Sequence, residues 1–416
     1  MYVCNVRSSL QGGIYRQVSQ SSGGNKVNSP HQIYSNRIPV LPLASRTSGK
    51  CSSCVPCRGQ TDAGNWSFLI MDAFYSSGVW IAEILQTSLP GLEEFWLWVT
   101  FLGDPKCVFI IYFPLAYFLL DQKVGVKVLW LGLISEWLNL VSKWFLFGER
   151  PFWWMFESGF YKKEDGFPRQ FPASCETGPG SPSGHCMITG AALWPVATTL
   201  TARISQHSKS QIAKVVPMQV YLLLLLAVGL SRVFILAHFP HQVLAGILAG
   251  ISLGWLLQSR VPLERELPFY LWSSLSLLLS TLTTYWILIA LGIDLSWSIN
   301  LATKWCANPR WIRMDTRPFA SLCRDVATAL GLGLAFHSSS YNQQKGKEYG
   351  WLQRGCCAIL TLGLLRLLSD AAQPEGVALW YGVSFVKYAT FPWVVVALLP
   401  RVVSAMTSRM TSPHKE

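Results

Sequence analysis

Charged residues are scarce in this chain of 416 residues. Asp, Glu, Lys and Arg together make up 13% of it, well below the roughly 25% of soluble globular domains. Apolar residues make up 51%, and several apolar runs reach the length of about 20 residues that an α-helix needs to cross a bilayer. The composition argues against a soluble protein and predicts an all-α polytopic membrane protein built as a helical bundle.

The sequence also lacks the patterns of nucleic-acid and metal binding. The formal net charge is +12, but the basic residues are scattered through loops and build no continuous basic face. The run Cys51-Ser-Ser-Cys54-Val-Pro-Cys57 has no second Cys or His pair that would complete a tetrahedral zinc site. The eleven cysteines form no convincing disulfide framework. We expect no nucleic-acid partner, no metal and no cofactor.

Residues 1–70 contain no sustained apolar period, and Ser, Gly, Asn, Gln and Pro dominate them. Such a segment cannot bury enough apolar surface to offset its ordering entropy, so we predict that it is disordered. The alternative is a misannotated extension, because Met71 opens the apolar part of the chain. We divide the remainder into a membrane domain at 71–401 and a tail at 402–416.

Nine apolar stretches are candidate membrane spans. The segment 79–102, which precedes them, is apolar on one face but carries Glu83, Glu93 and Glu94, so we predict an amphipathic helix that lies in the membrane interface. The nine predicted spans are 105–121, 126–147, 185–202, 216–236, 240–258, 268–292, 319–337, 354–370 and 378–400.

The distribution of Lys and Arg predicts which side each loop faces, because short cytoplasmic loops carry an excess of these residues. The basic connections 203–214, 259–267 and 338–354 share one face with the C-terminal tail, so we assign that face to the cytoplasm. The 293–318 loop is also basic, so charge alone does not decide the orientation. The loops assigned to the opposite face are 148–184, 237–239, 293–318 and 371–377.

Three clusters of ionisable residues stand near predicted span ends, where each such residue needs a partner or a function. In the first cluster, Lys143 and Arg150 are seven residues apart. Seven residues make about two helical turns, so on a continuous helix both side chains project from one face and form an anion site. The alternative is a pair of snorkelling residues that set the orientation of the span.

The second cluster is a turn rich in Gly, Pro and Ser, from Gly178 to His185, that leads into the third predicted span. The free N–H groups and positive dipole of a helix N-terminus suit a phosphate. His185 beside this site can donate a proton to a leaving oxygen. The alternative is a helix-capping turn with an incidental His.

The third cluster holds Arg232 and His238, which share a face if the helix of the fourth span continues to His238. An imidazole can attack phosphorus, and a guanidinium fork can bind the non-bridging oxygens. An interfacial Arg beside a structural His is the alternative. In the predicted topology all three clusters lie on one side of the membrane, so they can converge on one pocket for metal-independent phosphoryl transfer.

Taken in order, the three clusters form a signature that is far more specific than any one of them. It resembles the signature of the type 2 phosphatidic acid phosphatase and vanadium haloperoxidase superfamily. The motifs are Lys143-x6-Arg150-Pro151, Pro182-Ser183-Gly184-His185 and Ser231-Arg232-x5-His238.

Within that superfamily, the sequence from about Met71 to about Arg401 looks like the catalytic subunits of the glucose-6-phosphatase family, and its details resemble the ubiquitously expressed branch most. Gln242 stands where the broad superfamily usually has Asp. Glucose-6-phosphatases share this Gln, so the difference favours that family over the lipid phosphatases. Residues 1–70 have no counterpart in the resemblance.

The resemblance implies a nine-span protein of the endoplasmic reticulum membrane, with a lumenal active site and a cytoplasmic C-terminus. It implies hydrolysis of glucose 6-phosphate or a close sugar phosphate, coupled to a separate transporter that brings the substrate into the lumen. By motif, His238 is the nucleophile, His185 is the proton donor and Gln242 orients the imidazole. The residues expected to bind the phosphoryl group are Lys143, Arg150, Arg232, Ser183 and Gly184.

Two other functions stay open from the sequence. One is a lipid phosphate phosphatase of the same superfamily. The other is a membrane scaffold that has kept the fold without catalysis.

Overall fold

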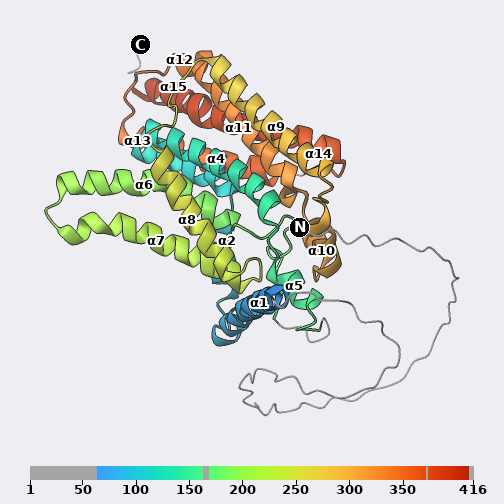
Figure 1. Cartoon of the computed structure of the whole chain (residues 1–416). Helices are drawn as coiled ribbons and strands as arrows, with labels where there is room; N and C mark the ends of the chain where they lie inside the picture. Colours follow the sequence, from blue (N-terminus) through green and yellow to red (C-terminus); the bar gives the residue numbers. More distant parts are fainter. Residues whose placement is uncertain (1–62, 163–167, 372, 412–416) are drawn as a thin grey trace, which may run out of the picture. The chain divides into compact units, whose positions relative to one another are not determined.

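The computed structural model describes residues 63–162, 168–371 and 373–411, and every regular element in these ranges is helical (Figure 1). The predicted extension up to residue 62, with Cys51, Cys54 and Cys57, lies outside the described residues. Both predicted boundaries of the membrane domain fall inside helices, since the first helix begins at Ala63 and the last ends at Thr411.

The described ranges contain both long and short helices. Before the fourth helix, the run from Val108 to Leu120 consists of short π-helical and α-helical turns. The helices are α1 (Ala63–Ser88), α2 (Glu93–Leu102), α4 (Gln122–Leu146), α5 (Pro151–Glu157), α6 (Gly184–His207), α7 (Gln211–Phe234), α8 (Pro240–Leu257), α9 (Leu267–Ala290), α10 (Trp297–Trp305), α11 (Pro318–Phe336), α12 (Ser339–Asn342), α13 (Trp351–Asp370), α14 (Val377–Trp393) and α15 (Leu399–Thr411).

Seven helices in the described ranges are long and apolar enough to cross a membrane, and they coincide with seven of the predicted spans. The first predicted span corresponds to the shorter apolar run Val108–Leu120, and the third to α6, which is long but less apolar. The helical membrane architecture is confirmed, while the count of nine spans stays a prediction.

The single interfacial helix predicted over 79–102 is wrong, because the chain forms two helices there. α1 ends at Ser88 and α2 begins at Glu93. Between them, Pro90 lacks a backbone N–H, and Gly91 adopts a φ of +88°, a left-handed conformation that ends a helix.

Helices α4 and α6 pack side by side and position the site. α4 also packs against α11, and α6 against α7 and α8. Gly250 lets α8 approach α6 closely, since a Cβ atom there would lie 2.5 Å from the Met187 carbonyl oxygen. Because the chain reverses between successive helices, the C-terminal end of α4, the N-terminal end of α6 and the α7–α8 junction meet at one end of the bundle.

A buried ion pair joins α4 to α11. Arg324 and Glu136 are each 4% exposed. Arg324 Nε donates to Glu136 Oε2 at 3.0 Å, and Nη2 contacts the second carboxylate oxygen. Because an unpaired charge in this position would be costly, the pair fixes how α11 sits against α4.

Candidate active site

The three predicted clusters gather around one cavity of about 230 Å³. Lys143, Arg150, His185 and Arg232 line it. His238 is fully buried next to these residues, close enough for the charges of Arg150 and Arg232 to act on its ring. A single buried water needs only about 10–15 Å³. The cavity therefore accommodates a small polar molecule rather than one water.

Lys143 and Arg150 both line the cavity, but the predicted helical spacing is not what brings them together. α4 ends at Leu146, and Phe147 takes a left-handed φ of 45°. Arg150 is extended because Pro151, which opens α5, disfavours helical geometry for the residue before it. The prediction that a continuous helix carries both side chains on one face is therefore wrong.

Arg150 is fully buried, and three of its nitrogen atoms donate hydrogen bonds to backbone carbonyls. Nε donates to Gly178 O at 2.6 Å, Nη1 to Ala237 O at 3.0 Å and Nη2 to Pro179 O at 3.2 Å. The first and third acceptors belong to the turn before α6, and the second directly precedes His238. Arg150 thus ties the turn to the segment that carries His238.

The turn from Gly178 leads into α6 as predicted. Ser183 is the N-cap residue directly before α6, and the N–H groups of the first turn, starting at Gly184, have no partners within the helix. His185 follows in this first turn and is 8% exposed at the cavity. Gly180 has no room for a side chain, because a Cβ atom there would lie 2.3 Å from the Glu149 carbonyl oxygen. The turn therefore packs directly on the α4–α5 connection.

Arg232 and His238 also meet by a route other than the predicted one. α7 ends at Phe234, so the helix does not continue to His238 and the predicted shared helical face is wrong. Leu236 adopts a φ of 61°. The N–H groups of Ala237 and His238 both donate to the Arg232 carbonyl, at 3.0 and 3.2 Å. This tight turn folds the imidazole back towards the end of α7.

The two ring nitrogens of His238 have different surroundings. Nδ1 lies 2.8 Å from the Gly180 carbonyl oxygen and 3.4 Å from Gln242 Oε1. Both are acceptors, so we assign the proton to Nδ1 and the lone pair to Nε2. Among the described residues, the buried Nε2 has no hydrogen-bond partner. Burial, and then the charges of Arg150 and Arg232, lower the pKa of His238 well below its ordinary value, so the ring is neutral.

Glu176 is a site residue that the sequence analysis missed. Its carboxylate pairs with Arg150 at 2.9 Å and with Arg232, and it lies 3.8 Å from His185 Nδ1. Burial alone would raise the pKa of Glu176, but the charges of Arg232 and Arg150 hold it well below its ordinary value. In the sequence, the only hint of Glu176 is its position two residues before the turn that begins at Gly178.

Arg232 keeps donors available beside this ion pair. It is fully buried, and within the described ranges its Nε and Nη1 have no hydrogen-bond partner. Buried donors are seldom left unpaired in folded proteins, so two such donors on one guanidinium indicate a binding site for an external acceptor. A phosphoryl group offers the acceptor oxygens that match this planar fork.

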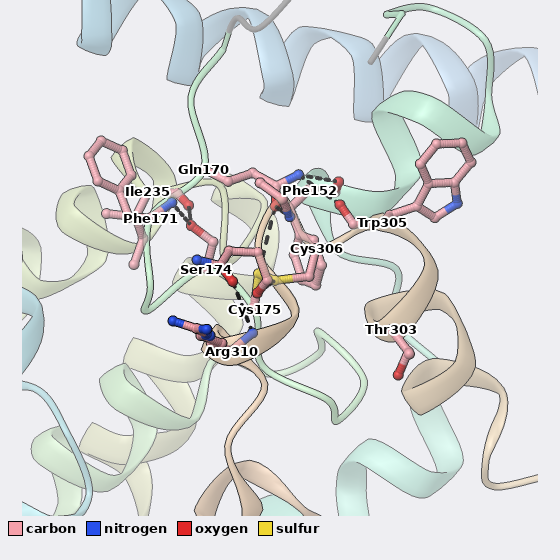
Figure 2. Close-up of a disulfide and its surroundings, with 12 residues drawn as sticks. Phe152, Gln170, Phe171, Ser174, Cys175, Ile235, Thr303, Trp305, Cys306 and Arg310 are labelled. Carbon is pink, nitrogen blue, oxygen red and sulfur yellow. Dashed lines mark hydrogen bonds between the residues drawn. A yellow bond between two sulfur atoms is a disulfide. The ribbon is translucent and has the colours of Figure 1, made fainter. Parts of the chain in front are cut away.

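A disulfide joins Cys175 to Cys306, 131 residues later, which corrects the expectation that the cysteines form no framework (Figure 2). Spacing gave no hint of it, because the bundle brings two separate loops together. Gln170 reinforces the junction by donating to the carbonyl groups of Phe152 and Trp305, at 3.3 and 3.0 Å. Figure 2 shows these bonds beside the disulfide. The loop after α10 is thereby attached to the loop that carries Glu176.

Comparison with known proteins shows the family to which the chain belongs. Residues 125–265 match the PAP2 superfamily. The chain is 53% identical over 343 residues to glucose-6-phosphatase 3 of Bos taurus and of Homo sapiens, which is 82% of this chain and 99% of each relative. It is 36% identical over 339 residues to glucose-6-phosphatase catalytic subunit 1 of Rattus norvegicus, 79% of this chain and 95% of the relative. No solved structure matches the chain.

Proposed function

The chain belongs to the glucose-6-phosphatase family, and we propose that it hydrolyses glucose 6-phosphate, or a close sugar phosphate, through a phosphohistidine on His238. The state of His238 carries this mechanism. Its Nδ1–H is held by a carbonyl oxygen, and its unpartnered Nε2 lies among cationic side chains. A neutral ring with this tautomer is a nucleophile that needs no separate base.

The phosphoryl group binds between the cations. Lys143 and Arg232 neutralise its oxygens, and Arg232 offers the two buried donors that have no internal partner. Arg150 adds charge while it holds the turn in place. The N-terminus of α6 contributes N–H groups from Gly184 onward, while the Ser183 N–H donates to the Gln242 carbonyl at 3.0 Å and Ser183 offers its buried hydroxyl instead. Fixed donors of this kind stabilise the charge that spreads over the oxygens in the transition state.

The reaction then proceeds in two displacements. His238 Nε2 attacks phosphorus, so an N–P bond forms while the P–O bond to the sugar breaks. His185 gives a proton to the departing sugar oxygen, and the sugar leaves as an alcohol. Water next attacks the phosphohistidine while His185 takes its proton. The N–P bond breaks, inorganic phosphate leaves, and the neutral His238 is regenerated with Gln242 and the Gly180 carbonyl at Nδ1.

We assign the site to the lumenal side of the endoplasmic reticulum membrane, with the C-terminus in the cytoplasm. The disulfide Cys175–Cys306 supports this orientation, because it joins two loops that the charge distribution assigns to the non-cytoplasmic face. Disulfides persist in oxidising compartments such as the endoplasmic reticulum lumen. A sugar phosphate made in the cytosol then needs a separate transporter to reach the site.

The test of the nucleophile is His238→Ala, with His207→Ala as the matched control. His207 is an exposed residue at the far end of α6. We expect His238→Ala to lose turnover by roughly a thousandfold or more, and to lose covalent labelling by radioactive substrate after acid-free quenching. Activity of His238→Ala equal to that of an active His207→Ala would refute the phosphohistidine mechanism, and background activity in wild type and both variants would favour a non-catalytic scaffold.

Substrate class and orientation have their own assays. Purified protein is offered glucose 6-phosphate and detergent-dispersed lipid phosphates, and turnover confined to lipids would favour the alternative of a lipid phosphatase. Microsomes that carry the protein but lack a sugar-phosphate transporter are assayed intact and permeabilised. A lumenal site predicts activity that appears only after permeabilisation.

A further inference from the structure

The cavity continues past the phosphate-binding residues into a second charged region that the mechanism does not use. Asp104 and Lys106, between α2 and the 108–120 run, line it from one side, and Asp315, before α11, lines it from the other. Asp104 connects the two regions, because it lines the same cavity as His185 and its Oδ1 accepts a hydrogen bond from the Lys106 N–H at 2.9 Å. A polar track thus leads from the proton donor to the loop that precedes α11.

Asp315 lies at the end of this track and contacts Lys106. Lys106 Nζ forms an ion pair with Asp315 Oδ2. Asp315 Oδ1 lies 3.5 Å from Arg313 Nε and, among the described residues, is a buried oxygen that accepts no hydrogen bond. The carboxylate is therefore bonded at one oxygen, while the other forms only a longer ion pair with the exposed Arg313 and can still accept a hydrogen bond. An available acceptor of this kind binds a hydroxyl donor.

The loop that carries Asp315 is fixed to the phosphate-binding loop at two points. The disulfide Cys175–Cys306 ties its beginning. Thr177 Oγ1 donates to the Thr316 carbonyl at 3.0 Å and ties the loop directly after Asp315. The position of Asp315 is thus set relative to the turn that binds phosphate, which is what recognition of a second part of the same substrate requires.

The chemistry of the substrate decides what this region contacts. In the proposed reaction His185 touches the leaving oxygen, so the groups that continue away from His185 lie beside the sugar. A carboxylate near a phosphate dianion would weaken binding unless it faces a neutral part of the molecule. Lys106 neutralises Asp315, and sugar hydroxyls are neutral donors.

We propose that Asp315, positioned by Lys106 and by the disulfide-anchored loop, binds the hydroxyl groups of the sugar and is a specificity-determining residue of the enzyme. This inference rests on the proposed function. The other role that the contacts allow is a structural ion pair that only holds the loop. Such a pair would affect every phosphate ester equally, whereas a recognition residue affects only substrates that carry hydroxyls.

The experiment compares two substrates on purified full-length protein in detergent. Glucose 6-phosphate carries hydroxyls, and p-nitrophenyl phosphate presents a phosphate without them. We expect Asp315→Asn to lower the ratio of kcat/KM for the sugar ester to kcat/KM for the aryl ester by about tenfold, because a site built to bind hydroxyls loses its advantage when one partner is weakened. The matched control is Asp294→Asn. The Asp294 carboxylate lies in an exposed turn and accepts hydrogen bonds from Ser296, so this variant is expected to keep the wild-type ratio.

Inhibition by the two products gives a second measurement on the same variants. In Asp315→Asn, inhibition by glucose is expected to weaken by about tenfold, while inhibition by inorganic phosphate changes by no more than about twofold. Asp315→Glu, which keeps the charge of the Lys106 pair but moves the carboxylate, is expected to show the same selective loss. This variant remains informative if the Asn substitution prevents insertion.

The outcomes separate this inference from the proposed function. An unchanged ratio, or equal weakening of both substrates and both products, would overturn the role of Asp315 while wild-type sugar-phosphate turnover stands. Wild-type protein that hydrolyses neither ester, or only the aryl ester, would overturn the proposed function itself.

Discussion

The carboxylate of Glu176 bridges the guanidinium groups of Arg150 and Arg232. Each arginine is fully buried, so each requires a counter-charge even before substrate binds. Glu176 provides it from inside the protein. An arriving phosphate dianion must share these arginines with Glu176 or displace it, and the strength of this internal pairing therefore sets part of the affinity for phosphate.

Glu176→Gln keeps the size of the side chain but leaves both arginines without their counter-charge. We expect the free energy of unfolding to fall by about 3 kcal/mol, because removal of one partner from a buried pair costs about 3–5 kcal/mol. Inorganic phosphate should restore more stability to the variant than it adds to wild type. Thermal unfolding with and without phosphate measures both effects, and Glu157→Gln, in a partly exposed pair with Lys304, is the control. Equal stabilisation by phosphate in variant and wild type would contradict this account of Glu176.

Arg150→Lys keeps a positive charge but cannot hold three carbonyl groups in one planar fork. The turn before α6 and the segment before His238 should then shift relative to one another. We expect kcat/KM to fall by roughly a hundredfold, the cost of misplacing catalytic groups by about 1 Å. The control is Arg169→Lys, at an exposed arginine paired with Glu93. If Arg150→Lys retains wild-type activity, the positive charge of Arg150 is sufficient for its role and the planar fork is not required.

Loss of the disulfide should weaken both stability and activity. Cys175→Ser or Cys306→Ser removes a link across 131 residues, and removal of such native bonds typically costs about 2–5 kcal/mol. We expect the double variant to lose no more than either single variant, and reductant to reproduce the loss in wild type. Unfolding temperature and activity are measured together, with Cys323→Ser in α11 as a control at an unpaired cysteine. Additive losses in the double variant would mean that the two thiols are not bonded.

The pH dependence of phosphoenzyme formation follows from His238. A protonated ring cannot attack, so the rate falls as the pH drops through the pKa of His238 in the folded protein. Because that pKa lies well below the ordinary 6.5, the acidic decline should begin below pH 6.5. Rapid-quench labelling at each pH measures it. A half-maximal rate at or above pH 6.5, traced to His238, would contradict the buried neutral ring.

The free energy of unfolding should also decrease as the pH falls. An unfolded His takes up a proton near pH 6.5, whereas folded His238 does not, so folding loses free energy as the pH falls below that value. Glu176 adds a second loss in a more acidic window. Its contribution is present above its ordinary pKa of 4.5 and disappears as the pH falls through the lower folded value. Unfolding temperature against pH, compared with Glu176→Gln, separates the two contributions.

Ordered motifs predicted which residues meet, although local periodicity gave the wrong reason. Lys143 and Arg150 were expected on one helical face. Instead, α4 ends at Leu146, and the extended backbone before Pro151 turns Arg150 inward. His238 was expected on the continuation of α7, yet a turn at Leu236 returns it to Arg232. The motifs encode the convergence of the chain at a binding site, while helical spacing applies only as far as the helix persists.

Features that depend on tertiary packing could not be predicted from spacing. Cys175 and Cys306 are far apart in the sequence, and only the arrangement of the loops pairs them. Glu176 has no periodic or motif signal of its own, because its role comes from two arginines on other elements. The pairing of Lys106 with Asp315 arises in the same way.

The bond between His238 Nδ1 and the Gly180 carbonyl gives the nucleophile a main-chain partner. A backbone carbonyl is present whatever amino acid occupies the position, so natural selection cannot exchange this partner as it exchanges Asp for Glu. A substitution that acts on the ring through this bond must displace the Gly180 peptide as a unit. Inherited substitutions in separate segments that pack on Gly180, such as the α4–α5 connection and Gln242, should then converge on a single molecular lesion, a misaligned imidazole.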